Sequence, residues 1–264
     1  MRHLMSILRS LSLVLLVLAG CQTMGPSPVA STLAVWGVGP DGRVYRWNGS
    51  SWSEPNPVAR LKQVSVSKQG GAVWGLGPDG RVYRWNGTSW DEPNAGARLD
   101  QISNLGGDSL WGIGSEGRIF QWVSGGPSWL PFTSSVRLKQ ISAGKFDNIW
   151  GLTSDDHVLK FNINTNGWDE PNPDARLYQI DAWTVEGAWG IGNASNLRVF
   201  KTQSGDHWDE PNPDAGLYQV SGVDDLNAWG VGDNNRVFQT KNGGESWEEP
   251  NPAAGLAQVS MGYE

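Results

Sequence analysis

Five copies of a short motif place a tryptophan, a carboxylate and an amide at fixed spacing along the chain. The sequence reads WDEPNP at 168–173 and again at 208–213, and close copies begin at Trp52, Trp90 and Trp247. These residue types suit sugar binding, because an aromatic face stacks on C–H groups while carboxylates and amides hydrogen-bond to hydroxyls. The candidate ligand-binding residues of the motif are Glu54, Asn56, Glu92, Asn94, Glu170, Asn172, Glu210, Asn212, Glu249 and Asn251.

The same motif also has a structural interpretation. If it forms the outermost strand of a sheet, the far side of that strand has no pairing partner, and proline is tolerated there because no N–H is needed. Proline on such an edge also discourages another molecule from adding a strand. The motif is therefore either the end of an edge strand, or the polar side of a ligand site, or both.

A second motif, Trp-Gly, repeats along the whole body of the chain. Its tryptophans are spaced 38, 37, 39, 39 and 40 residues apart, which indicates six copies of one structural unit. They are Trp36, Trp74, Trp111, Trp150, Trp189 and Trp229.

Each unit contains four short strand signals. In the third, LDQIS (99–103), LWGIG (110–114) and RIFQW (118–122) are followed by a short run around Trp129. Turn formers separate the second and third strands, such as PDG at 40 and SEG at 115, and an Asp-Gly pair favours a hairpin whose central residues take positive φ. Helix formers are scarce in the body, whereas the chain has 16 Trp and 35 Gly. The fold class predicted is all-β, a six-bladed propeller of four-stranded antiparallel blades.

The phase of the repeat predicts how the ring closes. No L-x-Q-[VI]-S strand precedes Ala34, and the chain ends with that strand, LAQVS at 256–260, without a following Trp-Gly. We expect the C-terminal strand to complete the N-terminal blade as its innermost strand, beside Val35 and Trp36, so that neither end leaves a free edge.

Comparison of the six repeats separates constant from variable positions. The Trp-Gly tryptophan and the outer tryptophan occur in every repeat, which predicts packing between neighbouring sheets. After the third strand stand Trp47, Trp85 and Trp122, then Phe161, but threonine in the last two repeats. Such positions reflect either drift or function, and Trp47 and Trp85 join the candidate ligand-binding residues. Four arginines before the inner strand vary in the same way: Arg60, Arg98, Arg137 and Arg176 give way to Gly216 and Gly255.

The N-terminus has the form of a targeting segment. Arg2 and Arg9 precede a short apolar run that ends in Leu-Ala-Gly-Cys at 18–21, which resembles the lipobox of bacterial lipoproteins. The resemblance implies a signal peptide at 1–20, acylation of Cys21 and, with Gln22 next, an outer-membrane lipoprotein facing the cell surface or the periplasm. Residues 21–33 would form the tether and 34–264 the propeller.

Composition limits the partners. Removal of Arg2 and Arg9 changes the formal charge from −7 to −9, and an acidic surface argues against nucleic acid or anionic lipid headgroups. We expect membrane contact only through the N-terminal lipid, a monomer, no cofactor and no metal, since no His, Cys or carboxylate cluster has metal-ligand spacing. Cys21 is the single cysteine, so no disulfide is available within the chain.

The first two repeats carry a family resemblance. V-W-G-[VL]-G-P-D-G-R-V-Y-R-W-N-G-x-S-W followed by R-L-x-Q-[VI]-S resembles the tectonin repeat of tachylectin-1-like lectins, and the match extends over 34–262. The resemblance implies a six-bladed propeller that binds glycans, including lipopolysaccharide or methylated sugars, through several equivalent sites. The E-P-N-P tail departs from the family pattern, and repeat three has Leu130, Pro131 and Phe132 in its place.

Two other functions stay open beside the lectin. TKNGGESW at 240–247 resembles the Asp-box of sialidases, but the arginines after the hairpin turns serve separate blades and do not form the triad of a glycosidase active site. We therefore expect no enzyme activity. The other alternative is a propeller scaffold that binds envelope proteins and needs no sugar site.

Overall fold

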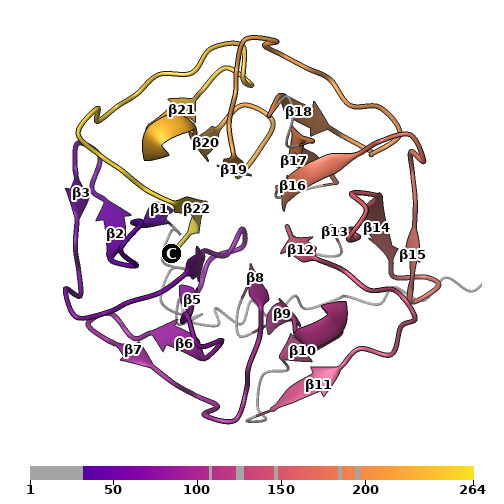
Figure 1. Cartoon of the computed structure of the whole chain (residues 1–264), viewed down its shortest axis with the longest axis horizontal. Helices are drawn as coiled ribbons and strands as arrows, with labels where there is room; N and C mark the ends of the chain where they lie inside the picture. The colour runs from indigo at the N-terminus through magenta and orange to yellow at the C-terminus, as the bar shows by residue number, and fades with distance from the viewer. Residues whose placement is uncertain (1–31, 107–108, 123–127, 146–147, 184–185, 194–196) are drawn as a thin grey trace, which may run out of the picture. The chain divides into compact units, whose positions relative to one another are not determined.

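The computed structural model describes residues 32–106, 109–122, 128–145, 148–183, 186–193 and 197–264. Six antiparallel sheets surround a common axis, which confirms the six-bladed β-propeller (Figure 1). Helical structure in the described part of the chain is limited to the short turns η1 (Ser115–Gly117) and η2 (Asp233–Asn235), and no helix there could span a membrane. The predicted signal peptide, Cys21 and most of the tether lie outside the described residues.

The blades follow one another along the chain, each running from the axis outward. Blade 1 contains β22 (Gln258–Tyr263), β1 (Leu33–Val38), β2 (Val44–Trp47) and β3 (Trp52–Ser53). Blade 2 contains β4 (Gln63–Ser65), β5 (Trp74–Leu76), β6 (Val82–Trp85) and β7 (Trp90–Asp91). Blade 3 contains β8 (Gln101–Gly106), β9 (Ser109–Ile113), β10 (Ile119–Trp122) and β11 (Trp129–Pro131). Blade 4 contains β12 (Gln140–Ala143), β13 (Ile149–Leu152), β14 (Val158–Asn162) and β15 (Gly167–Asp169).

The last two blades have a weaker outer edge. Blade 5 contains β16 (Leu177–Ala182), β17 (Ala188–Gly192) and β18 (Val199–Thr202), and blade 6 contains β19 (Gln219–Gly222), β20 (Ala228–Val231) and β21 (Val237–Thr240). Their fourth strands are reduced to single bridges, Lys201 with Asp209 and Gln239 with Glu248. The E-P-N motif thus follows the outermost strand or bridge in five blades, as predicted.

The C-terminal strand closes the ring. β22 pairs antiparallel with β1 over six residues, with Trp36 opposite Ser260, and lies innermost in blade 1 (Figure 1). The backbone N–H of Thr32 donates to the carbonyl of Glu264, so both ends of the described propeller are held together. The predicted closure is confirmed, and residues 32–264 contain all six blades.

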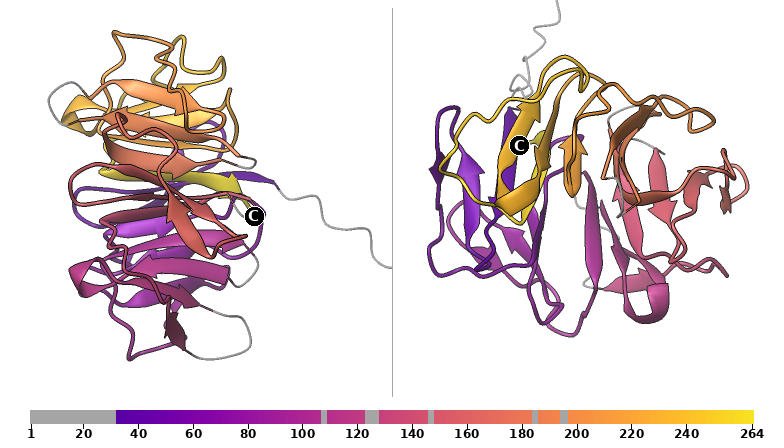
Figure 2. Two further views of the ribbon diagram at one scale, coloured as in Figure 1. Left: turned by 90° about the vertical axis from the view of Figure 1, so that its right-hand side faces the viewer. Right: turned by 45° about the horizontal axis from the view of Figure 1, so that its top comes forward.

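The antiparallel order gives the ring two distinct faces. The strands run roughly along the axis (Figure 2), so successive connections lie on alternate faces. The turns between second and third strands and the linkers that follow E-P-N therefore lie on the same face, which we call the linker face. The other hairpins form the hairpin face. In all six repeats the leucine before the inner strand donates its backbone N–H to a carbonyl in the turn of the preceding blade. Leu61, for example, donates to Gly42 at 2.9 Å. The turn residue has positive φ each time: Gly42, Gly80, Gly117, Asp156, Leu197 and Asn235.

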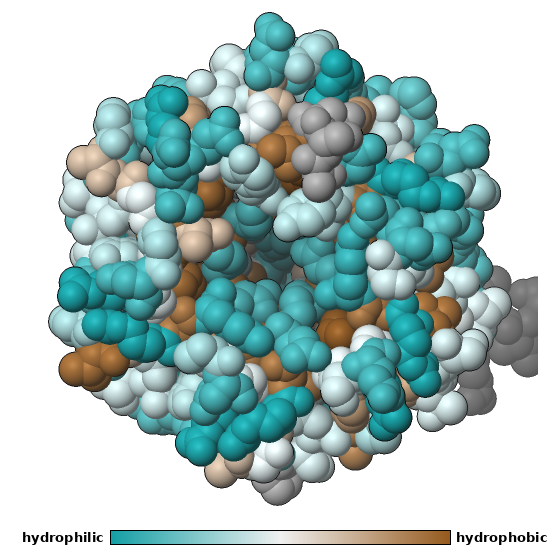
Figure 3. Space-filling view, in the orientation of Figure 1, coloured by the Kyte–Doolittle hydropathy of each residue, from teal (hydrophilic) through white to brown (hydrophobic). Residues whose placement is uncertain are grey.

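Glutamine side chains join each blade to the next around the axis. The amide of Gln63 donates to the carbonyl of Ile102 in the next inner strand, and Ile102 N–H donates back to Gln63 Oε1. The same reciprocal pair occurs at all six junctions, with donor–acceptor distances of 2.9–3.2 Å. These hydrogen bonds explain the constant glutamine of L-x-Q-[VI]-S, and hydrophilic residues surround the hollow axis (Figure 3). The ring consists of Gln63, Gln101, Gln140, Gln179, Gln219 and Gln258.

A second ring of hydrogen bonds lies one step along the same strands. Serine hydroxyls accept a backbone N–H from the next blade at 2.8–3.0 Å in five junctions, and Asp181 takes that role in the sixth. The exception has a partner across the ring: buried Lys68 of blade 2 donates from Nζ to Asp181 at 2.9 Å and to the Met261 carbonyl at 2.6 Å. Lys68 therefore ties blade 2, blade 5 and the closing strand together at the axis.

Tryptophan and leucine fill the space between blades. The six Trp-Gly tryptophans are at most 4% exposed, which confirms their predicted packing role. The glycine after each of them allows a close approach: a Cβ on Gly75 would lie 2.4 Å from Leu61 Cδ1 and 3.0 Å from Trp90. The leucine before the inner strand thus packs in the space that the glycine of Trp-Gly leaves open.

The Lys68–Asp181 pair yields a test of the axis. Asp181→Ser restores the serine of the other blades but leaves a buried ammonium without its carboxylate, which should cost about 3 kcal/mol of unfolding free energy. Lys68→Met should destabilise similarly. The double variant should lose clearly less than the sum of the two, as measured by urea unfolding. Simple additivity would show that the two residues do not interact.

Candidate ligand-binding clefts between the blades

Two clefts on the linker face occupy equivalent places in the ring. One of about 250 Å³ lies between blades 4 and 5, and one of about 220 Å³ lies between blades 6 and 1. In each, a linker after the E-P-N motif forms one wall and the next blade supplies two aromatic rings. The first is lined by Asn172, Asp174, Ala175, Arg176, Leu177, Phe200, His207 and Trp208, and the second by Tyr45, Trp52, Asn251, Ala253, Ala254, Gly255 and Leu256.

The structure combines an amide from one blade with aromatics from the next. Asn172 faces a cleft with Trp208 and Phe200, and Asn251 shares the equivalent cleft with Trp52 and Tyr45. Along the sequence, each asparagine follows the tryptophan of its own repeat. The partner is instead the tryptophan of the following repeat, because the linker crosses to the next blade directly after the motif.

The asparagines also shape the linker. Their Oδ1 accepts the backbone N–H two residues later, as in Asp174 to Asn172 at 3.0 Å, which fixes a tight turn. In three linkers the amide also donates to a carbonyl in the outer hairpin of the next blade, as in Asn172 to Asp206 at 3.1 Å. Asn56 and Asn212 make the other two such contacts, and the turn contact recurs at Asn94 and Asn251.

The glutamates of the motif lie within ion pairs of their own blade. Arg236 donates to both carboxylate oxygens of Glu249, and this bonding holds the pKa of Glu249 below its usual value and raises that of Arg236. Arg198 pairs with Glu210 at 3.1 Å. The remaining pairs are Arg81–Glu92, Arg43–Glu54 at 3.8 Å, and His157–Glu170 in the blade that lacks the arginine. A ligand role for these five carboxylates stays a prediction.

Blade 3 shows what happens without the motif. It has Leu130, Pro131 and Phe132 at the equivalent positions, and Arg118 pairs with Glu116 of its own turn at 3.0 Å. Phe132 packs against Trp111 with ring centroids 5.3 Å apart. The arginine after each hairpin turn therefore has a nearby carboxylate with or without E-P-N.

The variable aromatics Trp47 and Trp85 pack across the gap between blades. Trp85 lies 5.5 Å from Trp36 of the preceding blade, and Trp47 lies 5.3 Å from Trp229, measured between ring centroids. Both are half-buried. Trp47 also lines a cleft of about 700 Å³ on the hairpin face, where an exposed part of its ring could meet a ligand.

Blades 5 and 6 cover the same gap differently. Their Thr202 and Thr240 are buried and accept backbone N–H groups of the outer hairpin at 2.8 and 3.0 Å. These hairpins bring Gly205 against Trp150 and Gly244 against Trp189. The change from tryptophan to threonine is thus coupled to a different hairpin that packs on the same neighbouring tryptophan.

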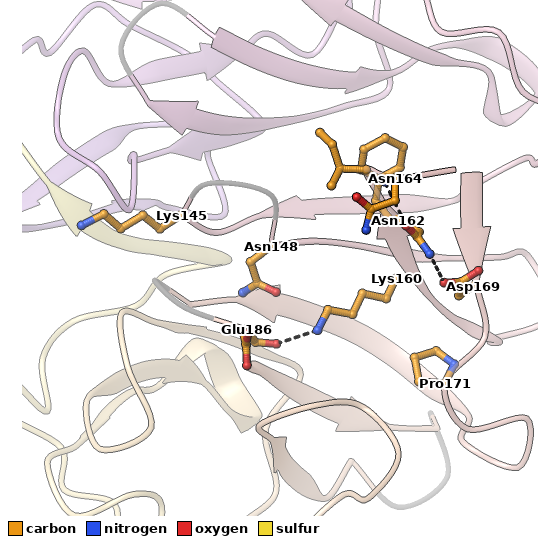
Figure 4. A pocket seen from close by; sticks show the side chains of 10 residues that line it. Lys145, Asn148, Lys160, Asn162, Asn164, Asp169, Pro171 and Glu186 are labelled. Carbon is orange, nitrogen blue, oxygen red and sulfur yellow. Dashed lines mark hydrogen bonds between the residues drawn. The ribbon is translucent and has the colours of Figure 1, made fainter. Parts of the chain in front are cut away.

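A second cleft of the hairpin face opens beside blade 4 (Figure 4). Its volume is about 670 Å³, and Lys160, Asn162, Asp169 and Glu186 line it. Lys160 Nζ lies 5.0 Å from the centroid of Trp150 and donates to the Glu186 carbonyl at 3.3 Å. Burial lowers the pKa of Lys160, with Coulombic attraction to Glu186 acting in the opposite direction.

Several residues of the clefts were not predicted from the sequence. Tyr45 and Phe200 stand at the second position of the third strand, where an aromatic occurs in five of the six repeats. That recurrence was the available signal. That Asp174 and His207 line the same cleft could not be predicted, because they come from a linker and a hairpin that meet only in the folded ring.

The comparison with known families agrees with the repeat geometry. The tectonin domain model matches residues 29–169 and 69–261, which together cover the whole body of the chain. The chain belongs to the tectonin domain family. No curated protein sequence matches it.

Solved structures show similar propellers at low sequence identity. A structure of YCF48 bound to D1 peptide is 18% identical, with a TM-score of 0.53, and covers 82% of this chain and 78% of its own. YCF48 from Cyanidioschyzon merolae is 17% identical, with a TM-score of 0.52, and the match covers 88% of this chain and 90% of that chain. At these identities the similarity shows a shared fold.

The bidentate pair at blade 6 predicts a pH effect. Because the folded pKa of Glu249 is lowered, the pair stabilises the protein above the unfolded pKa of the carboxyl and stops doing so as the pH falls through the folded pKa. Glu249→Gln should therefore lower the melting temperature at pH 7, and the gap to the parent should shrink in acid. Glu248→Gln, at an exposed neighbouring carboxylate, is the control. A pH-independent gap would contradict the assignment.

Proposed function

We propose that this tectonin propeller is a multivalent carbohydrate-binding protein whose sites are the interblade clefts of the linker face. One observation supports the proposal most: the same pairing of an amide with two aromatic rings recurs in the clefts 4/5 and 6/1. Aromatic faces suit the C–H side of a sugar ring, and Asn172 and Asn251 suit its hydroxyls. The ligands are glycans of a cell surface or envelope, with lipopolysaccharide and methylated sugars as the first candidates.

Repetition adds avidity. When one cleft holds a branch of a dense glycan surface, the effective concentration of further sugar at the other clefts rises, and overall affinity exceeds that of a single site. Clefts of 220–250 Å³ that each bind a sugar weakly are then sufficient for tight binding to a dense glycan surface. We assign the chain no catalytic step.

A protein-binding scaffold is the second candidate. The similar propeller YCF48 is recorded with a bound D1 peptide, so a ring of this shape can serve a peptide partner. Under this alternative, the linker face would bind an envelope protein, and the clefts would hold side chains in place of sugars.

A glycan array with residues 32–264 distinguishes the two. The lectin proposal expects binding that Asn172→Asp with Asn251→Asp reduces about tenfold, since aspartate keeps the turn-forming acceptor and loses the amide donor. Asn164→Asp, on the exposed hairpin face, is the control. The glutamates are tested by the same array with Glu→Gln in all five motifs, at a temperature where circular dichroism shows the variant to be folded: loss of binding by the folded variant would support their role.

If the parent binds no glycan on the array and the same face binds a peptide or protein ligand, the scaffold is favoured. Binding that survives both sets of substitutions would mean that the sugar site lies elsewhere.

The N-terminal sequence adds an anchor to this function. Cleavage before Cys21 and acylation of its thiol would hold the propeller at the outer membrane. Cys21→Ser should then move the protein from the membrane to the soluble fraction of fractionated cells, because a lipid chain supplies the apolar area for retention. Retention of the variant in the membrane would instead indicate a protein partner there.

A further inference from the structure

Four arginines stand at one equivalent position of the linker face, directly before the inner strand. They are Arg60, Arg98, Arg137 and Arg176 in the linkers that follow blades 1–4, and the linkers that follow blades 5 and 6 have Gly216 and Gly255 in their place. The conserved leucine that follows makes its backbone hydrogen bond in all six blades, with or without the arginine. The ring therefore closes without these guanidinium groups, and their presence needs another reason.

Each of these arginines is held by the linker in the same way. Nη1 of Arg60 donates to the carbonyls of Pro57 and Ala59 at 2.9 and 2.6 Å. The other three repeat both contacts at 2.6–3.0 Å. Because one nitrogen makes both bonds, the donors on Nε and Nη2 are left for another acceptor, and all four side chains are exposed.

A second set of arginines on the same face differs in charge balance. Arg43, Arg81, Arg198 and Arg236 pair with the motif glutamates, as described above. Among the described residues, none of Arg60, Arg98, Arg137 and Arg176 lies in an ion pair. Arg43 and Arg81 also pair with Asp41 and Asp79 of their turns. This set is thus fully engaged with carboxylates of the protein, whereas in the described part of the chain the hydrogen bonds of the other set are with backbone carbonyls only.

The linker sequences divide the ring into two sectors. Two residues before the arginine, blades 1–3 have the uncharged Val58, Gly96 and Ser135, whereas blades 4 and 5 have Asp174 and Asp214. Exposed Lys62 adds a cation to the first sector, and exposed Asp100 offsets one. In a chain with a net charge of −7, the linkers of blades 1–3 are therefore a cationic sector.

We propose that Arg60, Arg98 and Arg137 bind the anionic groups, carboxylates or phosphates, of an acidic glycan. The inference rests on the proposed carbohydrate function and assigns different ligands to different clefts. Guanidinium groups bind both anions through parallel N–H donors. The equivalent Arg176 lines a cleft directly, which places this position within reach of a sugar bound between blades. The cleft 6/1, with Ala253 and Gly255, would take a neutral sugar.

The test compares three immobilised polymers: polygalacturonate, phosphomannan and neutral dextran. The parent, residues 32–264, should bind at least one of the first two, and Arg60→Gly with Arg98→Gly and Arg137→Gly should weaken that binding about tenfold or more and flatten its salt dependence. Glycine is the residue that blades 5 and 6 carry there. If the triple variant melts early, Arg→Gln at the same positions replaces it.

A charge-matched control removes three cations from the hairpin face: Lys160→Gln, Lys201→Gln and Lys241→Gln. Equal losses in both triple variants would show an effect of net charge alone and would overturn the inference. A preference between polygalacturonate and phosphomannan identifies the anion as carboxylate or phosphate. If the parent binds array glycans but neither anionic polymer, this inference is wrong and the proposed function stands. If the parent binds no glycan at all, both are wrong.

Discussion

Each blade is joined to the next at the axis by a glutamine side chain that behaves like an added backbone peptide. It accepts one N–H and donates to one carbonyl of the neighbouring inner strand, six times around the ring. Buried polar groups must be paired, so an incomplete ring would leave donors and acceptors exposed along a whole strand. The innermost position of β22 follows from this requirement, because only that strand supplies Gln258.

Closure at the axis sets the gaps between neighbouring blades further out from the axis. The blades diverge from the axis, and the inner and outer tryptophans fill the widening gap between them. Beyond these rings the linkers cross from one blade to the next on a single face. The clefts therefore form where a linker of one blade meets the aromatics of the next, and the packing that stabilises the fold also builds their walls.

The sequence was sufficient to predict the blade number, the strand order and the closing strand, because each follows from a period that repeats six times. It could not predict which residues meet between blades. Asn172 and Trp208 lie in different repeats, and the sequence showed only that each recurs. The ion pairs of the glutamates join residues of one repeat, such as Arg236 and Glu249, and were missed for another reason: the pairing of the outer strands that brings these side chains together cannot be read from the motif alone. Lys68 and Asp181 break the repeat, so no periodic pattern could connect them.

The central claim is that the repeated residues build the closed ring while ligands enter the clefts of the linker face. A crystal structure of residues 32–264 with an oligosaccharide chosen by the array tests it most directly. The account predicts sugar density between blades, stacked on Trp208 or Trp52 and within hydrogen-bond distance of Asn172 or Asn251. Sugar bound only at the mouth of the axis, or only in the hairpin-face cleft around Lys160, would contradict it.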